Sequence, residues 1–167
     1  MIALRNLAFS RAAVTLVEGA SLQLHPGWKV GLVGANGCGK SSFFALLQGG
    51  LHADAGELEL PPRWTIAHVA QETPALADTA LEFTLDGDAE LRRVERDLAA
   101  AEAGHDGVKV AELHGRLEEI GGYGARARAA ELLHGLGFAD ADQARPVADF
   151  SGGWRVRLNL ARALMCR

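Results

Sequence analysis

One run of eight residues, 34–41, constrains the fold of this chain more than any other feature. Its sequence, GANGCGKS, matches the pattern G-x-x-x-x-G-K-[S/T]. A short apolar run, Lys29–Val33, precedes it and is suited to a buried parallel strand. Residues Ser41–Gln48 follow with helical character and end at Gly49-Gly50, as a helix C-terminus does. A strand, a glycine-rich loop and a helix in this order predict an α/β phosphate-binding unit.

Each part of the motif has a physical role. Glycine lets the backbone curl until consecutive N–H groups point at phosphate oxygens, and three are available: Gly34, Gly37 and Gly39. The helix that begins near Lys40 directs its positive end at the same anion, and the lysine adds a point charge. The hydroxyl of Ser41 is expected to complete a Mg²⁺ shell. Cys38 is either a reactive thiol at a helix N-terminus or a side chain that fills a variable loop position.

The rest of the first third predicts short strands separated by turns. Apolar residues predict one strand within Ile2–Phe9 and another at Ala20–Leu24. A second pair, Glu57–Leu60 and Thr65–Val69, flanks a Pro-Pro break.

The pattern becomes helical after residue 78. Capping-box spacing at 79–82 predicts a short helix. Residues 89–103 and 110–120 each carry one apolar seam and are joined by the turn GHDG at 104–107, so they predict an antiparallel helical hairpin. The pair either lies on a sheet or projects and packs mainly on itself. A third helix is predicted at 125–135.

A second motif, FSGGW at 150–154, precedes a long amphipathic helix. Ser151 is suited to be its N-cap. The glycines Gly152 and Gly153 are costly in a first helical turn unless something approaches the backbone closely. Taken alone, the motif fits either an ordinary helix start or a second anion-binding helix N-terminus.

Composition excludes several classes of protein. The 167 residues carry a net charge of −4, and no broad polybasic surface for nucleic acid is visible. No apolar run approaches the roughly 20 residues of a membrane span, and the first residues lack a signal-peptide pattern. The two cysteines, Cys38 and Cys166, suggest neither a disulfide framework nor a metal site, so we expect a reducing, cytoplasmic setting.

Order and spacing of the motifs resemble an ATP-binding-cassette (ABC) domain. GANGCGKS corresponds to Walker A, VAQE at 69–72 to the Q-loop, and DFSGGWRVRLNLARAL at 149–164 to the signature motif. The sequences around them, QETPAL and LLHGLGF, are similar to the ABC-F subfamily, in particular its YheS-like and Uup-like bacterial branch. FSGGW stands where the family usually has LSGGQ, so Trp154 is a departure.

The resemblance implies a fold and a domain plan. The fold is α/β, a P-loop NTPase core of ABC type with N-terminal antiparallel strands and an inserted helical subdomain. The core with Walker A and Q-loop is expected at 1–85, the helical subdomain at 86–148 and the signature motif with its helix at 149–167. The hairpin, at about 89–120, corresponds to the arm of ABC-F proteins.

The resemblance also implies the site residues. Lys40 and Gln71 would be catalytic, Ser41 and Gln71 would contact Mg²⁺, and Gln71 would sense the γ-phosphate. The signature residues would cap the γ-phosphate of an ATP held by a different cassette. The full set expected to hold ATP is Gly34, Asn36, Gly37, Cys38, Gly39, Lys40, Ser41, Ser42, Ser151, Gly152 and Gly153. Arg11 holds the place of the adenine-stacking aromatic, with Phe9 two residues earlier.

The function implied is that of a soluble ABC-F ATPase, a ribosome-associated translation factor with a second ABC domain in the same chain. The family's Walker B strand would follow Arg167, so we expect this chain to bind ATP but not to hydrolyse it. The alternative is the ATP-binding subunit of an ABC membrane transporter; the arm-like hairpin favours the first interpretation. A chromosome-maintenance head is disfavoured because the insert is too short for a long coiled coil.

Overall fold

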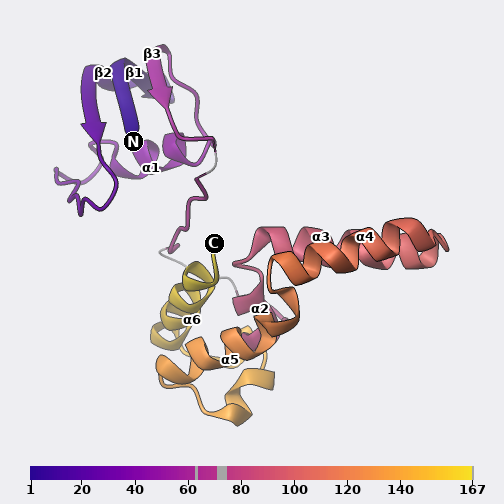
Figure 1. The fold of residues 1–167 in the computed structure, drawn as a ribbon. Helices are drawn as coiled ribbons and strands as arrows, with labels where there is room; N and C mark the ends of the chain where they lie inside the picture. Colours follow the sequence, from indigo (N-terminus) through magenta and orange to yellow (C-terminus); the bar gives the residue numbers. More distant parts are fainter. Residues whose placement is uncertain (63, 71–74, 167) are drawn as a thin grey trace. The chain divides into compact units, whose positions relative to one another are not determined.

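A computed structural model describes residues 1–62, 64–70 and 75–166 of the chain. The chain forms two compact units, Met1–Ile66 and Ala67–Arg167. The first contains all three strands and one helix, and the second contains the other helices (Figure 1).

The first unit is a small antiparallel sheet packed against a helix. Its strands are β1 (Ile2–Arg11), β2 (Val14–Leu24) and β3 (Ala55–Glu59), in the order β2-β1-β3. The central strand β1 is the most buried, because it has a neighbour on both sides. Helix α1 (Lys40–Leu47) contributes Leu46 to a core that β1 supplies with Leu4, Leu7 and Phe9.

Two predicted strands are absent from the described residues. Lys29–Val33 and Thr65–Val69 have no strand assignment, and no strand of the described sheet pairs with either. Val33 is 90% exposed, so the prediction of a buried strand there is wrong for this structure. An apolar segment becomes a strand only when a neighbouring strand satisfies its backbone N–H and C=O groups, and none does so here.

The second unit is helical, and its predicted helices are confirmed. Thr79 accepts a hydrogen bond from the backbone N–H of Glu82 (3.2 Å) and caps the first helix. Asp88 and Asp106 cap the two hairpin helices in the same way. Three short 3₁₀ turns complete the unit (Gly122–Gly124, Asp140–Ala144 and Val147–Asp149). The α-helices are α2 (Ala80–Leu85), α3 (Ala89–Ala103), α4 (Gly107–Glu119), α5 (Ala125–Gly135) and α6 (Gly152–Met165).

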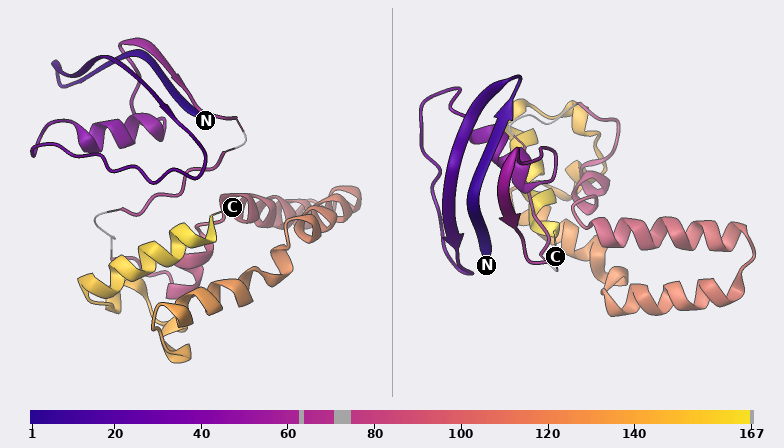
Figure 2. Two further views of the ribbon diagram at one scale, coloured as in Figure 1. Left: turned by 60° about the vertical axis from the view of Figure 1, so that its left-hand side comes forward. Right: turned by 90° about the horizontal axis from the view of Figure 1, so that it is seen from above.

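Helices α3 and α4 form the predicted hairpin, and it projects. Figures 1 and 2 show the two helices side by side, extending away from α5 and α6. Burial of the larger apolar side chains falls along its length: Leu91 and Leu117 are buried at the base, Leu98 and Leu113 are half-buried further out, and Val108 at the tip is 72% exposed. The small Ala101 remains buried between the helices near the outer end. The hairpin therefore packs mainly on itself, and the alternative in which it lies on a sheet is not observed within the described part of this unit.

The base of the hairpin is fixed by charged groups. Arg92 on α3 forms ion pairs with Glu82 (2.6 Å) on α2, Asp86 (2.8 Å) after it, and Glu95 (2.8 Å). Hydrogen bonds from Arg92, and more weakly from Arg126, hold the pKa of the Glu82 carboxyl below its ordinary value against the opposing effect of burial. Because that pKa is lowered by folding, the contribution of Glu82 to stability is present at neutral pH and is lost as the pH falls through it.

Gly56 gives a stability test for the sheet. Its φ is +75°, and a Cβ there would lie 2.2 Å from the backbone oxygen of Asn6. We predict that Gly56→Ala costs about 3 kcal/mol, from left-handed strain of ~1–2 kcal/mol and overpacking of ~1–3 kcal/mol. Gly27→Ala is the control, because Gly27 also has a positive φ (+81°) but has nothing within 4 Å of that Cβ among the described residues.

Denaturant titrations of both variants and the wild type measure the difference. Equal losses of stability in the two variants would show that the contact between β1 and β3 at Gly56 is not as tight as described.

Candidate functional site

The loop before α1 has the curled backbone that its sequence predicts. Gly37 and Gly39 have φ values of +82° and +101°, a region in which other residues are strained. Gly34 has a different constraint: a Cβ there would lie 2.6 Å from the Sγ of Cys38, so a larger residue would displace the thiol. The two positive φ values and the tight packing at Gly34 keep the loop compact ahead of the helix.

The N-terminus of α1 is open. Its N-cap residue, Gly39, has no side chain to accept a hydrogen bond from the first-turn amides. Ser41 is exposed in that first turn, whereas Ser42 is buried and its Oγ accepts a hydrogen bond from Nη1 of Arg11 (3.5 Å). Free amides at a helix N-terminus favour an anion, and the Ser41 hydroxyl is exposed beside them.

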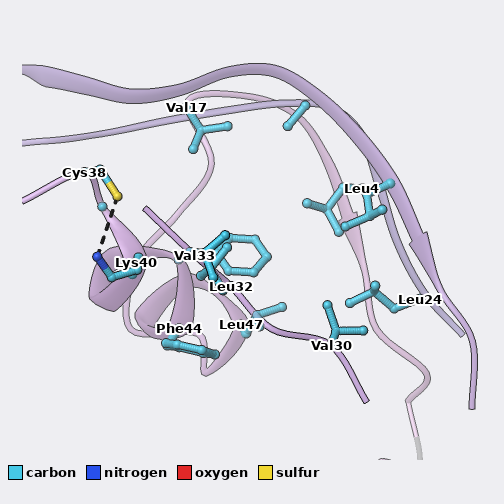
Figure 3. A pocket seen from close by; sticks show the side chains of 14 residues that line it. Leu4, Val17, Leu24, Val30, Leu32, Val33, Cys38, Lys40, Phe44 and Leu47 are labelled. Atoms are coloured by element: carbon cyan, nitrogen blue, oxygen red, sulfur yellow. Dashed lines mark hydrogen bonds between the residues drawn. The ribbon is translucent and has the colours of Figure 1, made fainter. Parts of the chain in front are cut away.

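Lys40 folds back over the loop. Its Nζ donates hydrogen bonds to the carbonyl oxygens of Gly34 (2.7 Å) and Ala35 (2.8 Å), and it lies 3.9 Å from Sγ of Cys38 (Figure 3). The lysine therefore already lies at the loop that would surround a phosphate. A phosphate oxygen is a stronger partner for an ammonium group than a neutral carbonyl is.

An apolar cavity of about 400 Å³ lies beside this loop. Its walls come from β1, β2, the segment 30–33 and α1, and Figure 3 shows Leu4, Leu24 and Val30 at one end and Cys38 and Lys40 at the other. Its lining suits an apolar occupant.

The second site is the N-terminus of α6. Ser151 is its N-cap, and its side chain makes no capping hydrogen bond. Neither Gly152 nor Gly153 has a positive φ, and nothing among the described residues lies within 4 Å of a Cβ built on either. Packing and backbone conformation in the described unit therefore do not require these glycines. They leave the helix N-terminus accessible.

Trp154, the departure in the second motif, serves packing. Its ring meets that of Phe138 at a centroid distance of 4.8 Å, and the guanidinium of Arg157 lies 4.6 Å from the Trp154 centroid. The indole therefore anchors the first turn of α6 to the core. The sequence offered no signal for this, because Phe138 is 16 positions away in a loop.

Comparison with known proteins agrees with this arrangement. The family model described as "ABC transporter" matches residues 17–167. The chain belongs to the ATP-binding cassette family. It is 50% identical over 167 residues to "Probable ATP-binding protein YheS" of Escherichia coli (strain K12). This match covers all of this chain and 26% of that protein. It is 37% identical to human "ATP-binding cassette sub-family F member 3", over 99% of this chain and 24% of that protein.

These relatives confirm the resemblance to ABC-F proteins, and the chain spans about a quarter of their length. A solved structure titled "Structure of ATP binding subunit of ABC transporter" shares the fold with a TM-score of 0.65 at 18% identity, covering 99% of this chain and 62% of that one. The α/β fold class predicted from the sequence is therefore confirmed as that of an ABC ATP-binding domain.

The other residues considered for the nucleotide site lie in different surroundings. Gln71 lies outside the described residues. Phe9 is fully buried and stacks on Phe43 at a centroid distance of 6.4 Å, so it is not available to a base. Arg11 remains, exposed and bonded to Ser42 at the start of α1. Among the described residues, no helix combines the length and apolar character needed to cross a bilayer.

Sequence reasoning missed Asn159. Its Nδ2 donates a hydrogen bond to the carbonyl oxygen of Ala70 (3.2 Å), the residue that precedes Gln71. Asn159 is almost fully buried in the middle of α6. A polar residue at a core-facing position of an amphipathic helix is the signal that could have identified it, because buried amides are hydrogen-bonded.

Cys38 gives a test of the loop. It is exposed and lies beside Lys40, so a nucleotide in the loop should shield it. We predict that saturating Mg-ATP slows alkylation of Cys38 at least fivefold and leaves Cys166 unchanged. Mass spectrometry of the two cysteine peptides from one reaction gives both rates. An unchanged rate at Cys38 would show that the nucleotide is elsewhere.

Proposed function

We propose that the chain is the ATP-binding part of the first cassette of a cytoplasmic ABC-F ATPase that acts on the ribosome as a translation factor. The observation that carries this proposal is the position of Lys40, whose ammonium lies at a glycine-rich loop before an open helix N-terminus. The family relationship supports ATP as the ligand.

The loop and the first turn of α1 would hold the phosphates of ATP. Lys40 would exchange its bonds to Gly34 and Ala35 for phosphate oxygens, and Ser41 with Gln71 would contact Mg²⁺. Bound Mg²⁺ supplies charge neutralisation for the phosphates. The guanidinium of Arg11 would stack on the base, since it lies next to the same helix turn through Ser42. The set proposed for the phosphates is Gly34, Asn36, Gly37, Cys38, Gly39, Lys40, Ser41 and Ser42.

The N-terminus of α6 would act on a different nucleotide. Ser151, Gly152 and Gly153 would approach the γ-phosphate of an ATP held by a second ABC domain of the same protein. Support comes from their exposure and from the open space around both glycines. A helix N-terminus attracts an anion, and glycine lets that anion reach the backbone.

The projecting hairpin supports the ribosome-acting function over a transporter subunit. Its outer half has no other element of the described unit packed against it (Figure 2), so it is free to contact a large partner. Similarity to an ABC sub-family F protein points the same way. Co-purification with ribosomes rather than with a membrane protein distinguishes the two functions.

Lys40→Ala in the full-length protein is predicted to weaken Mg-ATP binding by this cassette at least tenfold, about 1.4 kcal/mol, because the phosphates lose their nearest cation. Calorimetric titration measures it. Lys29→Ala is the control, because Lys29 is exposed and lies outside the loop, whereas Lys40 is half-buried beside it. Equal affinities for the wild type and Lys40→Ala would refute the assignment of the phosphate loop.

Unlike Lys40→Ala, Gly153→Asp should impair ATP hydrolysis but not ATP binding by this cassette. It places a negative charge where the γ-phosphate of the other nucleotide would approach, so we predict unchanged ATP binding by the Lys40 loop and at least tenfold slower hydrolysis by the full-length protein. The matched control is Gly107→Asp, the same change in the first turn of α4, where the built Cβ also has open space. Phosphate-release assays decide it; retained hydrolysis in Gly153→Asp would remove the proposed role of the second motif.

A further inference from the structure

Helix α6 belongs to both apolar clusters of the helical unit. Leu158 and Ala161 pack with Phe138, Phe150 and other residues near the Ser151 end. Met165, at the other end, is buried in the cluster that holds the base of the hairpin, including Leu91, Val94, Leu117 and Ile120. At 1.5 Å per residue, α6 is about 21 Å long. One rigid element thus connects the hairpin base with the second motif.

The contact between the hairpin base and α6 is backbone against backbone. A Cβ on Gly87, in the turn between α2 and α3, would lie 1.8 Å from the carbonyl oxygen of Arg162 and 3.0 Å from the Cβ of Met165. Gly87 does not have a positive φ, so its conformation would accept other residues. Glycine is required here because α6 leaves no room for a side chain.

The same turn is held to the hairpin by ion pairs. Asp86, the residue before Gly87, pairs with Arg92 in the first turn of α3. Asp88, the residue after it, caps α3 through the N–H of Leu91 (3.0 Å) and pairs with Arg128 of α5 (3.4 Å). These bonds attach the turn to the first turn of α3 and to α5.

A third contact joins α6 to Ala70, the residue before Gln71. The buried side chain of Asn159, between the two ends of α6, donates to the carbonyl oxygen of Ala70. Arg162, one turn further along, lies over the ring of Phe83 on α2 at 5.1 Å. Helix α6 thus contacts the hairpin base and Ala70, and its own first turn belongs to the second motif.

We propose that α6 transmits displacement of the hairpin to the nucleotide-handling segments, with Gly87 as the positioning residue at which the hairpin base contacts the helix. A force on the hairpin tip turns its base, the base presses on the α6 backbone at Arg162, and the helix carries Ser151–Gly153 and Ala70 with it. Close-packed interiors have low compressibility and transmit strain. The consequence for ATP turnover rests on the proposed function; the mechanical coupling does not.

The test compares Gly87→Ala with Gly115→Ala in the full-length protein. Both add one methyl group to the hairpin region, but Gly115, within α4, has open space around the built Cβ. We expect Gly87→Ala to change the amide hydrogen exchange of residues 151–158 at least threefold. It should also lower kcat at least fivefold, with the KM for ATP within twofold of the wild type. Gly115→Ala should leave all three within twofold.

Arg92→Lys is the second variant and is used for the same measurements if Gly87→Ala does not fold. Lysine keeps the charge but cannot bond Glu82, Asp86 and Glu95 together, so the hairpin base loosens. A change in exchange confined to residues 80–95, with residues 151–158 and kcat unaltered, overturns the proposal. If the wild type hydrolyses no ATP, the proposed function fails, whereas the exchange data still decide whether the hairpin and α6 are coupled.

Discussion

The open N-terminus of α1 is the constraint on which the first unit depends. The chain must turn sharply after residue 33 and begin a helix without a capping side chain, so it needs glycine at 37 and 39 with positive φ. That geometry leaves the first-turn amides free. Lys40 offsets part of the cost by donating to two loop carbonyls. In the proposed function, phosphate oxygens would replace these two carbonyls as the partners of Lys40.

Helices were predictable from the sequence because their determinants are local. The apolar seams and the turn between them predict α3 and α4, and α3 and α5 begin and end at the predicted residues. The structure adds the caps, Asp88 and Asp106, which act on neighbouring residues and are equally local. The strand predicted at 29–33 failed because strand formation depends on a partner elsewhere in the chain, and no described residue provides one. Apolar character alone could not reveal that dependence.

In the candidate site, too, features set by neighbouring residues were predictable and contacts between distant residues were not. The start of a helix at Lys40, directly after the glycine-rich loop, could be predicted because neighbouring residues in the sequence determine it. Contacts between distant segments could not: Asn159 with Ala70, and Gly87 with Arg162, join residues more than 70 positions apart. They depend on how α6 packs against the other segments, and no pattern in the sequence predicts that packing. Through these contacts α6 packs against Ala70 and Gly87, in addition to containing the second motif.

Residues 1–167 contain only three lysines, Lys29, Lys40 and Lys109, which permits a direct test of the central claim. An ATP analogue with a lysine-reactive acyl group on the γ-phosphate labels whichever lysine lies beside that phosphate. Peptide mapping should find the label on Lys40, with labelling suppressed by excess ATP and not by adenosine. Modification of Lys29 or Lys109 with Lys40 left intact would contradict the assignment of residues 34–41 as the phosphate loop.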